Sequence, residues 1–344
     1  MSEYKIRAVT VALPEISEDL IDLLKRLKEE CRGADIWTFR LALPPSKFSE
    51  ELVEKAEHFR READFDYLAI PFSLEDKILD IAEAVSEFSG VFASINISSL
   101  DYWDIPKVAE KYFSLLDYLR RRGNYITQCK IALAVRGPVL TPYFPCASSI
   151  DKKPCLMGAL LYINYLKKGV KSAERIRRAG LSLLELLSRA GSVLGFDVAG
   201  VDLSISPWME ESVVELVADK NGLSLYKILK LNKAIEEAAE ELRVCGFNEV
   251  MLPLAEDNGL KELVRKGVLR GRDFVAASAV CVAGVDLVLL SSVDPIAVLN
   301  YIKDCLAVAH LKGRPFGLRL VYTDGAPGDE VELGKFGRTP VVEL

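Results

Sequence analysis

Two stretches of the sequence place polar side chains at every second position of a predicted strand. In VAGVDLSISP the alternating polar residues are Asp202, Ser204 and Ser206, and in VFASINISS they are Ser94, Asn96 and Ser98. Residues two apart on a β-strand point to the same face, so each stretch forms a file of polar groups. A strand that is buried on both faces is normally apolar throughout, and the two files therefore predict a shared polar interior.

Further polar residues stand near the predicted carboxyl ends of strands. Arg136 follows the run IALAV, while Glu256 and Asp257 follow VMLPLA. Arg40 lies within WTFRLAL and shares a face with Thr38. Hydrogen bonding inside a well-satisfied core accounts for any one of these residues, but α/β folds place their ligands at the carboxyl ends of strands. The convergence of the whole group predicts a binding pocket.

These residue types favour an enzyme that acts on a small anionic metabolite by acid/base chemistry. Arg40 and Arg136 are expected to orient a carboxylate or a phosphate. Asp202, together with Glu256 or Asp257, is expected to supply the acid and the base. Several carboxylates in one pocket raise the pKa of at least one of them, which general acid catalysis requires.

The predicted site is completed by three residues from the later part of the chain, which are Cys281, Asp286 and Arg338. Cys281, within SAVCVAGVD, is a candidate nucleophile, although a free cysteine is most often simply buried. Asp286 follows in the same segment, and Arg338 in the tail can present a guanidinium to an anion. The residues expected to bind substrate are Arg40, Asn96, Arg136, Ser204, Ser206, Asp286 and Arg338.

The same residues fit a second hypothesis, a regulatory protein that binds a metabolite without converting it. A carboxylate-rich site can also hold a divalent cation, Mg²⁺ or Ca²⁺, through oxygen ligands. No GxGxxG motif follows the first predicted strand, and the sequence contains no GxxxxGK[ST] or HExxH motif. No cofactor is therefore predicted from a motif.

The composition favours small-molecule chemistry over binding to nucleic acids or membranes. The 344 residues are 50% hydrophobic and 27% charged, and 44 basic against 50 acidic residues give a formal net charge of -6. This negative net charge disfavours electrostatic binding over a large surface to the phosphate backbone of nucleic acids or to anionic lipids. No apolar run approaches the roughly 20 residues of a membrane-spanning helix, and the start of the chain lacks signal-peptide features, so a cytoplasmic protein is expected.

Cysteine and amide usage indicates the environment of the protein. The seven cysteines are scattered without a C-x-x-C pair, which disfavours structural zinc and a secreted disulfide framework. Cys146 and Cys155 flank one stretch of the chain and form either a disulfide or two separate thiols. A single glutamine, Gln128, and two histidines resemble the usage of hyperthermophile proteins.

Short apolar runs alternate with longer amphipathic segments, a pattern typical of parallel strands joined by helices. Strands are predicted at residues 6–13, 35–43, 66–71, 91–97, 130–135, 198–206, 249–254, 285–290 and 317–322. Helices are predicted at residues 17–30 and 49–61, two in succession over 155–195, and one over 223–245. This pattern leaves a closed barrel and an open doubly wound sheet as alternatives.

No linker or charge block marks a domain boundary, so residues 1–344 are expected to form a single domain. A Pro-rich loop at 136–154 and a Gly-rich tail at 324–344 interrupt the alternation. We expect the loop and the tail to cover the pocket from the same end. The alternative is that they mediate self-association as a homodimer, through the aromatic residues Tyr143, Phe144 and Phe336.

Several short motifs follow one another along nearly the whole chain. The earlier ones are Thr38-Phe39-Arg40, Thr141-Pro142-Tyr143-Phe144-Pro145 and Asp202-Leu203-Ser204. The later ones are Leu252-Pro253-Leu254-Ala255-Glu256-Asp257, Ser278-Ala279-Val280-Cys281 and Gly328-Asp329. In their order and spacing they resemble the proteins grouped as domain of unknown function 711, whose fold is similar to that of the pyruvate formate-lyase-like glycyl radical enzymes.

The resemblance implies a ten-stranded α/β barrel with a polar interior at one mouth. It does not imply radical chemistry, because the R-V-x-G signature that holds a glycyl radical is missing from the tail. The chain departs from the family pattern after Asp286, where Leu290-Ser291-Ser292-Val293-Asp294-Pro295 replaces a proline-rich Gly-Asp-Thr stretch, and at Gly334-Lys335. The resemblance therefore implies a fold and no particular substrate.

Overall fold

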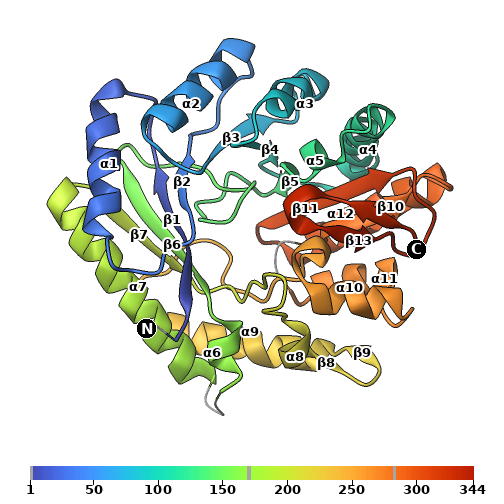
Figure 1. The fold of residues 1–344 in the computed structure, drawn as a ribbon. Helices are drawn as coiled ribbons and strands as arrows, with labels where there is room; N and C mark the ends of the chain where they lie inside the picture. The colour runs from blue at the N-terminus through green and yellow to red at the C-terminus, as the bar shows by residue number, and fades with distance from the viewer. Residues whose placement is uncertain (1–2, 169–171, 282–283) are drawn as a thin grey trace. The chain divides into compact units, whose positions relative to one another are not determined.

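The computed structural model describes residues 3–168, 172–281 and 284–344, and it has the α/β architecture that the alternation of segments predicts (Figure 1). The chain divides into two units. Unit 1 comprises Met1–Asn96, Pro138–Ser204 and Lys233–Asn248. Unit 2 comprises Ile97–Gly137, Ile205–Asn232 and Glu249–Leu344.

The sheet of unit 1 has the strand order β4-β3-β2-β1-β6-β7. Its strands are β1 (Lys5–Ala12), β2 (Phe39–Ala42), β3 (Tyr67–Ser73), β4 (Val91–Ile97), β6 (Cys155–Leu161) and β7 (Asp197–Asp202). Neighbouring strands run parallel except β1 and β6, which are antiparallel. Parallel strands are normally covered on both faces, and β3, β4 and β6 are accordingly buried along almost their whole length.

Different parts of the chain cover the two faces of this sheet. The helices of unit 1 are the short η1 (Glu18–Leu20), α1 (Ile21–Glu30), α2 (Glu50–Glu62), α3 (Ile78–Glu87), α6 (Ile163–Leu166) and α7 (Ser172–Leu194) (Figure 1). Gly158 of β6 packs so closely on α7 that a Cβ there would lie 2.8 Å from Leu183. The preceding Met157 points the opposite way and packs near Leu140 of the Pro-rich loop. This loop therefore lies against the face opposite α7.

Unit 2 contains a three-stranded sheet with the order β10-β11-β5. Its strands are β5 (Ile131–Val135), β10 (Asp286–Ser291) and β11 (Phe316–Thr323), and two small pairs are β8 (Ala218–Asp219) with β9 (Gly222–Leu223) and β12 (Glu330–Glu332) with β13 (Arg338–Pro340). β10 and β11 are parallel, whereas β11 and β5 are antiparallel. Its helices include α4 (Ile105–Arg121), α5 (Tyr125–Gln128), α8 (Val214–Val217), α10 (Asn258–Arg265), α11 (Gly271–Ser278) and α12 (Pro295–Lys312), with the short η2 (Tyr102–Asp104), η3 (Leu254–Glu256) and η4 (Gly334–Phe336).

The tail is part of the core of unit 2. Leu333, Phe336 and Val341 pack in one hydrophobic cluster with Leu289 of β10 and Val321 of β11. Lys261 of α10 donates from Nζ to the backbone carbonyl oxygen of Phe336 at 2.6 Å. The tail is therefore anchored by buried side chains and does not run free over the surface.

The predicted elements agree with the structure except in two places. The strand predicted at 249–254 is wrong, because these residues form only isolated parallel bridges at Val250 and Pro253 before η3 begins at Leu254, and a proline has no N–H to donate to a strand ladder. The strand predicted at 91–97 is confirmed as β4, and α9 (Leu225–Ala239) lies within the helix predicted at 223–245. The prediction of two helices over 155–195 is wrong in its first part, because residues 155–161 form β6. The run CLMGALL is buried throughout and has no alternation, so periodicity alone does not separate a buried strand from a buried helix. Residues 169–171 of that prediction lie outside the described residues.

The large, mostly parallel sheet confirms an α/β fold. Among the described residues, the named strands of neither unit close into a barrel. None of the helices in the described ranges is long and apolar enough to span a bilayer.

Candidate functional site

Asp202, at the end of β7, is a fully buried carboxylate in unit 1. Its Oδ2 accepts hydrogen bonds from Thr141 Oγ1 at 3.0 Å and from the backbone N–H of Phe247 at 2.8 Å. Its Oδ1 accepts from both the backbone N–H and the hydroxyl of Ser204, and from the backbone N–H of Asn248 at 3.1 Å. Burial raises the pKa of Asp202, and these donors oppose the rise. The carboxylate thus fastens three separate segments of unit 1 to one another.

The turn that contacts Asp202 depends on a glycine. Gly246 has a φ of +78°, and a Cβ at this position would lie 2.0 Å from Asp202 Oδ2. Asn248 also has a positive φ, and its Oδ1 accepts from the backbone N–H of Leu203 at 2.9 Å. A side chain at position 246 would therefore push the turn away from the carboxylate.

Arg40 of β2 is nearly buried, and its contacts are to the chain itself. Its Nε donates to Thr38 Oγ1 at 2.9 Å, and its Nη1 donates to the backbone carbonyl oxygen of Pro142 at 3.2 Å. The guanidinium also lies 5.3 Å from the centre of the Phe144 ring. Arg40 therefore holds the Pro-rich loop against the sheet through a charge-assisted hydrogen bond and a cation–π contact.

The Pro-rich loop contacts the polar file of β7 as well. Thr141 donates to Asp202, and the hydroxyl of Tyr143 donates to the backbone carbonyl oxygen of Ser204 at 3.2 Å. Three of the predicted site residues, Arg40, Asp202 and Ser204, are thus gathered around one short piece of the loop. Whether this piece also contacts a ligand stays a prediction.

Asn96, at the carboxyl end of β4, is the fourth predicted residue in unit 1. Its Nδ2 donates to Ser94 Oγ at 3.0 Å, while its Oδ1 is buried without a hydrogen-bond partner among the described residues. Thr10 Oγ1 and Ser149 Oγ are also buried without a hydrogen-bond partner among the described residues. Unit 1 therefore has polar groups with unused hydrogen-bonding capacity in its interior.

Two further predicted residues, Glu256 and Asp286, form buried ion pairs with Arg319 in unit 2. Arg319 donates from Nε and Nη2 to the two oxygens of Asp286, at 2.6 and 2.9 Å, and from Nη2 to Glu256 Oε1 at 3.2 Å. Its Nη1 donates to the backbone carbonyl oxygen of Cys129 at 3.2 Å. Burial alone would lower the pKa of Arg319, but the two carboxylates raise it. These groups form a satisfied charge cluster, the arrangement that a buried ion pair needs.

Asp257 caps helix α10. It accepts from the backbone N–H groups of Gly259 and Leu260, at 2.8 and 3.1 Å, and from that of Val213 at 2.9 Å. Burial raises the pKa of Asp257, and the donors again oppose the rise. An aspartate at a helix N-cap is a common structural device, and it accounts for these contacts.

Arg338 is exposed, and its backbone carbonyl oxygen accepts from Arg265 Nη2 at 3.2 Å. Arg265 also forms a paired contact with Glu330, which lies on the strand that pairs with β13. The Arg338 side chain itself stays a predicted anion contact.

Cys281 is completely buried, and burial raises the pKa of its thiol to about 12. Lys312 donates to the backbone carbonyl oxygen of Cys281 and, at 2.8 Å, to Glu249 Oε2. A nucleophilic cysteine acts as the thiolate, which these surroundings disfavour at neutral pH. All seven cysteines are free thiols, so Cys146 and Cys155 are not joined.

Arg136 and Ser206 are the last two predicted residues, and both belong to unit 2. Arg136 follows β5 with a φ of +58°, and its Nε is buried without a hydrogen-bond partner among the described residues. A positive φ is unusual for a residue with a side chain, and such positions are enriched near functional sites. Ser206 is buried.

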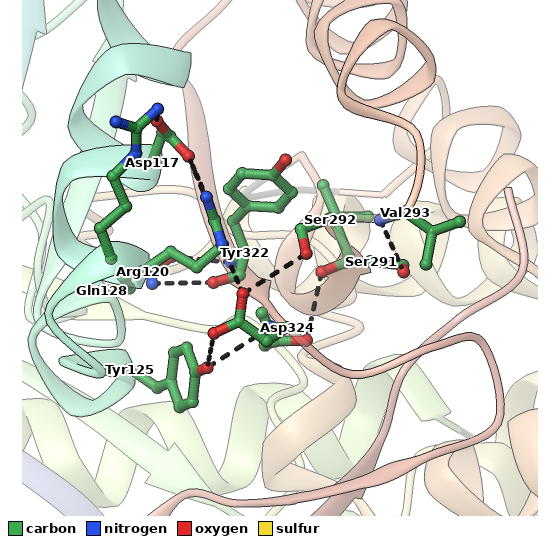
Figure 2. Close-up of polar contacts among 12 residues, drawn as sticks. Asp117, Arg120, Tyr125, Gln128, Ser291, Ser292, Val293, Tyr322 and Asp324 are labelled. Atoms are coloured by element: carbon green, nitrogen blue, oxygen red, sulfur yellow. Dashed lines mark hydrogen bonds and ion pairs between the residues drawn. The ribbon is translucent and has the colours of Figure 1, made fainter.

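The structure adds a cavity that the sequence analysis did not predict. It has a volume of about 200 Å³ and lies in unit 2 at the carboxyl ends of the parallel strands β10 and β11 (Figure 2). Its lining residues are Phe113, Asp117, Arg120, Arg121, Ser292, Pro295 and Tyr322. They come from α4, from β11, from the segment that follows β10 and from the start of α12. This edge of a parallel sheet is where α/β proteins bind small molecules.

Arg120 is the central charged group of this cavity. It donates from Nε and Nη2 to Asp117 Oδ1, at 3.1 and 2.7 Å, and from Nη1 to Asp324 Oδ1 (Figure 2). Its guanidinium lies 5.1 Å from the centre of the Tyr322 ring. Burial alone would lower the pKa of Arg120, but Asp117 and Asp324 raise it, so the side chain remains a cation.

Asp324 begins the tail directly after β11. In addition to Arg120, it accepts from the hydroxyl of Tyr125 at 3.0 Å and from Ser292 Oγ at 3.5 Å (Figure 2). The hydrogen bond from Arg120 is the main cause that lowers the pKa of Asp324, while burial raises the pKa of Tyr125. Asp324 is therefore ionised and Tyr125 protonated at neutral pH.

Two weak signals in the sequence pointed toward this cavity. Ser292 and Asp324 each follow a predicted strand by two residues, and the predicted site residues Glu256 and Asp257 follow theirs by two and three. Arg120 instead stands among three consecutive arginines at the end of a helix, where basic residues are ordinary. Among the described residues, no group of three or more His, Cys, Asp or Glu side chains is arranged to hold a metal ion.

Replacing Asp202 with Asn is expected to lower the free energy of unfolding by about 3 kcal/mol, since an amide leaves several buried donors without an acceptor. Urea denaturation measures this loss. The matched control is Asp197→Asn, at the exposed start of the same strand, which should change the stability by no more than about 0.5 kcal/mol. Equal effects of the two substitutions would contradict the role given to Asp202.

Asp324 is expected to stabilise the fold only while it is ionised. Because Arg120 lowers the pKa of Asp324 in the folded state, the stabilisation is present above the unfolded pKa of about 3.9 and is lost as the pH falls through the folded pKa. The melting temperature of Asp324→Asn should therefore lie below that of the unsubstituted protein at pH 7, and the difference should shrink below about pH 4. Calorimetry across this range checks it, and a difference that persists undiminished in acid would refute the charge-based account.

Comparison with known proteins places this fold in a family. The family model described as "Uncharacterised ACR (DUF711)" matches residues 7–334. Among the relatives, each called a "UPF0210 protein", that of Carboxydothermus hydrogenoformans is 28% identical over 189 residues, which cover 51% of this chain and 41% of the relative. That of Pyrobaculum arsenaticum is 30% identical over 188 residues, 50% of this chain and 41% of the relative.

A relative from Sulfurisphaera tokodaii aligns more completely. The alignment is 415 residues long, with 29% identity, and it covers 99% of this chain and 90% of the relative. The chain thus spans about two-fifths of the length of the first relatives it matches and most of the length of this one. With a family model matched from the first strand into the tail, the chain belongs to the DUF711 family.

Proposed function

We propose that this protein binds a small anionic metabolite in the Arg120 cavity of unit 2. The observation that carries the proposal is a cavity of about 200 Å³ at the carboxyl ends of two parallel strands, lined by a guanidinium that is held in place. A volume of this size accommodates a small molecule of several heavy atoms and excludes a nucleotide. The ligand would therefore be a small acid.

The geometry of Arg120 supports an anionic ligand. Asp117 fixes the guanidinium through two hydrogen bonds, and it also pairs with Arg121 at 2.8 Å. A planar guanidinium in a fixed position is suited to the oxygens of a carboxylate or phosphate. Ser292 and the ring of Tyr322 add a hydroxyl and an aromatic wall to the same cavity.

An enzyme that uses acid/base chemistry is the second candidate. The observation that favours it is that burial raises the pKa of the carboxyls Asp202 and Asp257, which is the direction of shift that general acid catalysis needs. Their hydrogen bonds to backbone and hydroxyl donors are accounted for by structure alone, which makes binding the simpler function. Glu256 stays a candidate acid or base, and Cys281 a candidate nucleophile.

We also propose the ten-stranded barrel that the resemblance to the pyruvate formate-lyase-like fold implies. Isolated bridges support it within each unit. In unit 1, Val201 pairs with Val244, and in unit 2, Pro253 pairs with Asp286 of β10, both in parallel. Each bridge is a parallel pairing of the kind that an additional strand would make within its own unit. A single domain, a cytoplasmic location, a homodimer and a lack of nucleic-acid or membrane partners remain predictions of the sequence.

Isothermal titration with succinate and with inorganic phosphate tests the binding proposal. We expect at least one of them to bind the unsubstituted protein, and Arg120→Gln to weaken that binding by tenfold or more because a charge-assisted contact is lost. The matched control is Arg122→Gln, two residues further along the chain and absent from the cavity lining. Ser292→Leu, which fills the cavity without changing a charge, should weaken binding as well.

Equal binding by Arg120→Gln and Arg122→Gln would place the ligand elsewhere. Binding that survives Arg120→Gln but is lost in Asp202→Asn, with the fold verified by circular dichroism, would instead favour a site in unit 1.

A further inference from the structure

The carboxylate of Asp324 already occupies the donors that an acidic ligand would use. Its Oδ1 accepts from Arg120, and its Oδ2 accepts from the hydroxyl of Tyr125 at 3.0 Å, while Ser292 Oγ lies 3.5 Å from Oδ1 (Figure 2). A guanidinium, a phenol and an alcohol converging on one planar carboxylate make a recognition site for that group. Two of these donors, Arg120 and Ser292, also line the cavity.

Asp324 differs from the other carboxylate on Arg120 in how it is held. The side chain of Asp117 is 18% exposed and pairs with both Arg120 and Arg121, whereas that of Asp324 is 60% exposed. An ion pair whose carboxylate stays well solvated contributes little to stability, because that charge gains little by pairing. Asp324 can therefore leave Arg120 at low cost, while Asp117 keeps the guanidinium in place.

The chain around Asp324 can accommodate such a movement. Asp324 is followed by Gly325, and the next contact of the tail is local, since the backbone N–H of Ala326 donates to Asp329 Oδ2 at 2.8 Å. The first contact to the buried cluster is made at Gly328, whose backbone N–H donates to the carbonyl oxygen of Val341 at 2.9 Å. The buried anchors of the tail, Leu333 among them, come only later. A displacement of Asp324 thus changes the segment 324–328 without unpacking the core.

We propose that Asp324 is a built-in stand-in for the ligand, and that the metabolite is a carboxylic acid whose carboxylate displaces Asp324 from Arg120, Tyr125 and Ser292. This inference rests on the proposed function, since it assumes that the cavity binds an anion. It adds the chemical class of the ligand, a carboxylate in preference to a phosphate. It also couples occupancy of the cavity to release of the start of the tail.

The competition predicts how affinity responds to Asp324. When an internal group occupies the site, the apparent dissociation constant is the intrinsic one divided by the fraction of protein in which the site is open. Asp324→Asn removes the competing charge and keeps the shape of the side chain. It should tighten succinate binding by about twofold to fivefold, the change that corresponds to the small stability of an exposed ion pair. The matched control Asp329→Asn removes a carboxylate of the same tail that accepts from the backbone N–H of Ala326 and does not line the cavity, and it should leave the succinate affinity unchanged.

Isothermal titration with succinate and inorganic phosphate, on the unsubstituted full chain and on Asp324→Asn, Asp329→Asn and Arg120→Gln, separates the outcomes. Tighter succinate binding in Asp324→Asn alone, with phosphate weaker than succinate, supports the inference. Succinate binding that depends on Arg120 but is unchanged in Asp324→Asn overturns the inference and leaves the proposed function standing. Stronger binding of phosphate than of succinate overturns the carboxylate class.

If neither probe binds the unsubstituted protein or Asp324→Asn, both proposals fail together. Amide hydrogen exchange gives a second, independent readout. Saturating succinate should speed the exchange of residues 324–328 in the unsubstituted protein and have no such effect in Arg120→Gln. Unchanged exchange in a protein that binds succinate would contradict the displacement of Asp324.

Discussion

The Asp202 carboxylate is the interaction on which the interior of unit 1 depends. A charge buried without partners would cost several kcal/mol, so a fold that buries it must bring donors to it from whatever parts of the chain are available. Here they come from the Pro-rich loop, from the residues that follow β7 and from the turn at 246–248. The contact of the loop with Asp202 through Thr141 and the glycine at 246 both serve that requirement.

Unit 2 meets the same requirement with the charges reversed. Arg319 is the buried cation, and Asp286, Glu256 and a backbone carbonyl group surround it. Arg120 is a third case, but it lies at the surface, where its carboxylate partners differ in exposure. In the two buried clusters the polar groups are mutually satisfied, whereas at Arg120 one of the partners can be exchanged. Exchangeable partners are what a binding site needs, and this contrast directs attention to the cavity.

The sequence predicted the fold class and the buried strand members of the polar files because both rest on local periodicity. Ser98 is instead exposed beyond the end of β4, and Ser204 and Ser206 follow the end of β7. The alternation around Ser94 and Asp202 placed these side chains on buried strand faces, and the structure buries both. β6 was not predicted as a strand because a strand that is covered on both faces shows no alternation of polar and apolar residues. Arg120 was not predicted as a site residue for a different reason. Its role depends on the contact with Asp324, about two hundred residues away in the sequence, and no local sequence pattern indicates that contact.

The path of the chain between the units limits how this protein can be taken apart. Each unit is assembled from three separate segments, so the backbone passes from one to the other at five points, once within helix α9. Neither unit exists as a continuous stretch that a gene fragment could encode. A truncation that removes more than residues 1–96 from the amino end, or more than residues 249–344 from the carboxyl end, would take pieces from both units. An exchange of one unit between relatives would have to rejoin the chain at every crossing. The connectivity of the chain therefore requires that the two units be inherited together, whatever either unit binds.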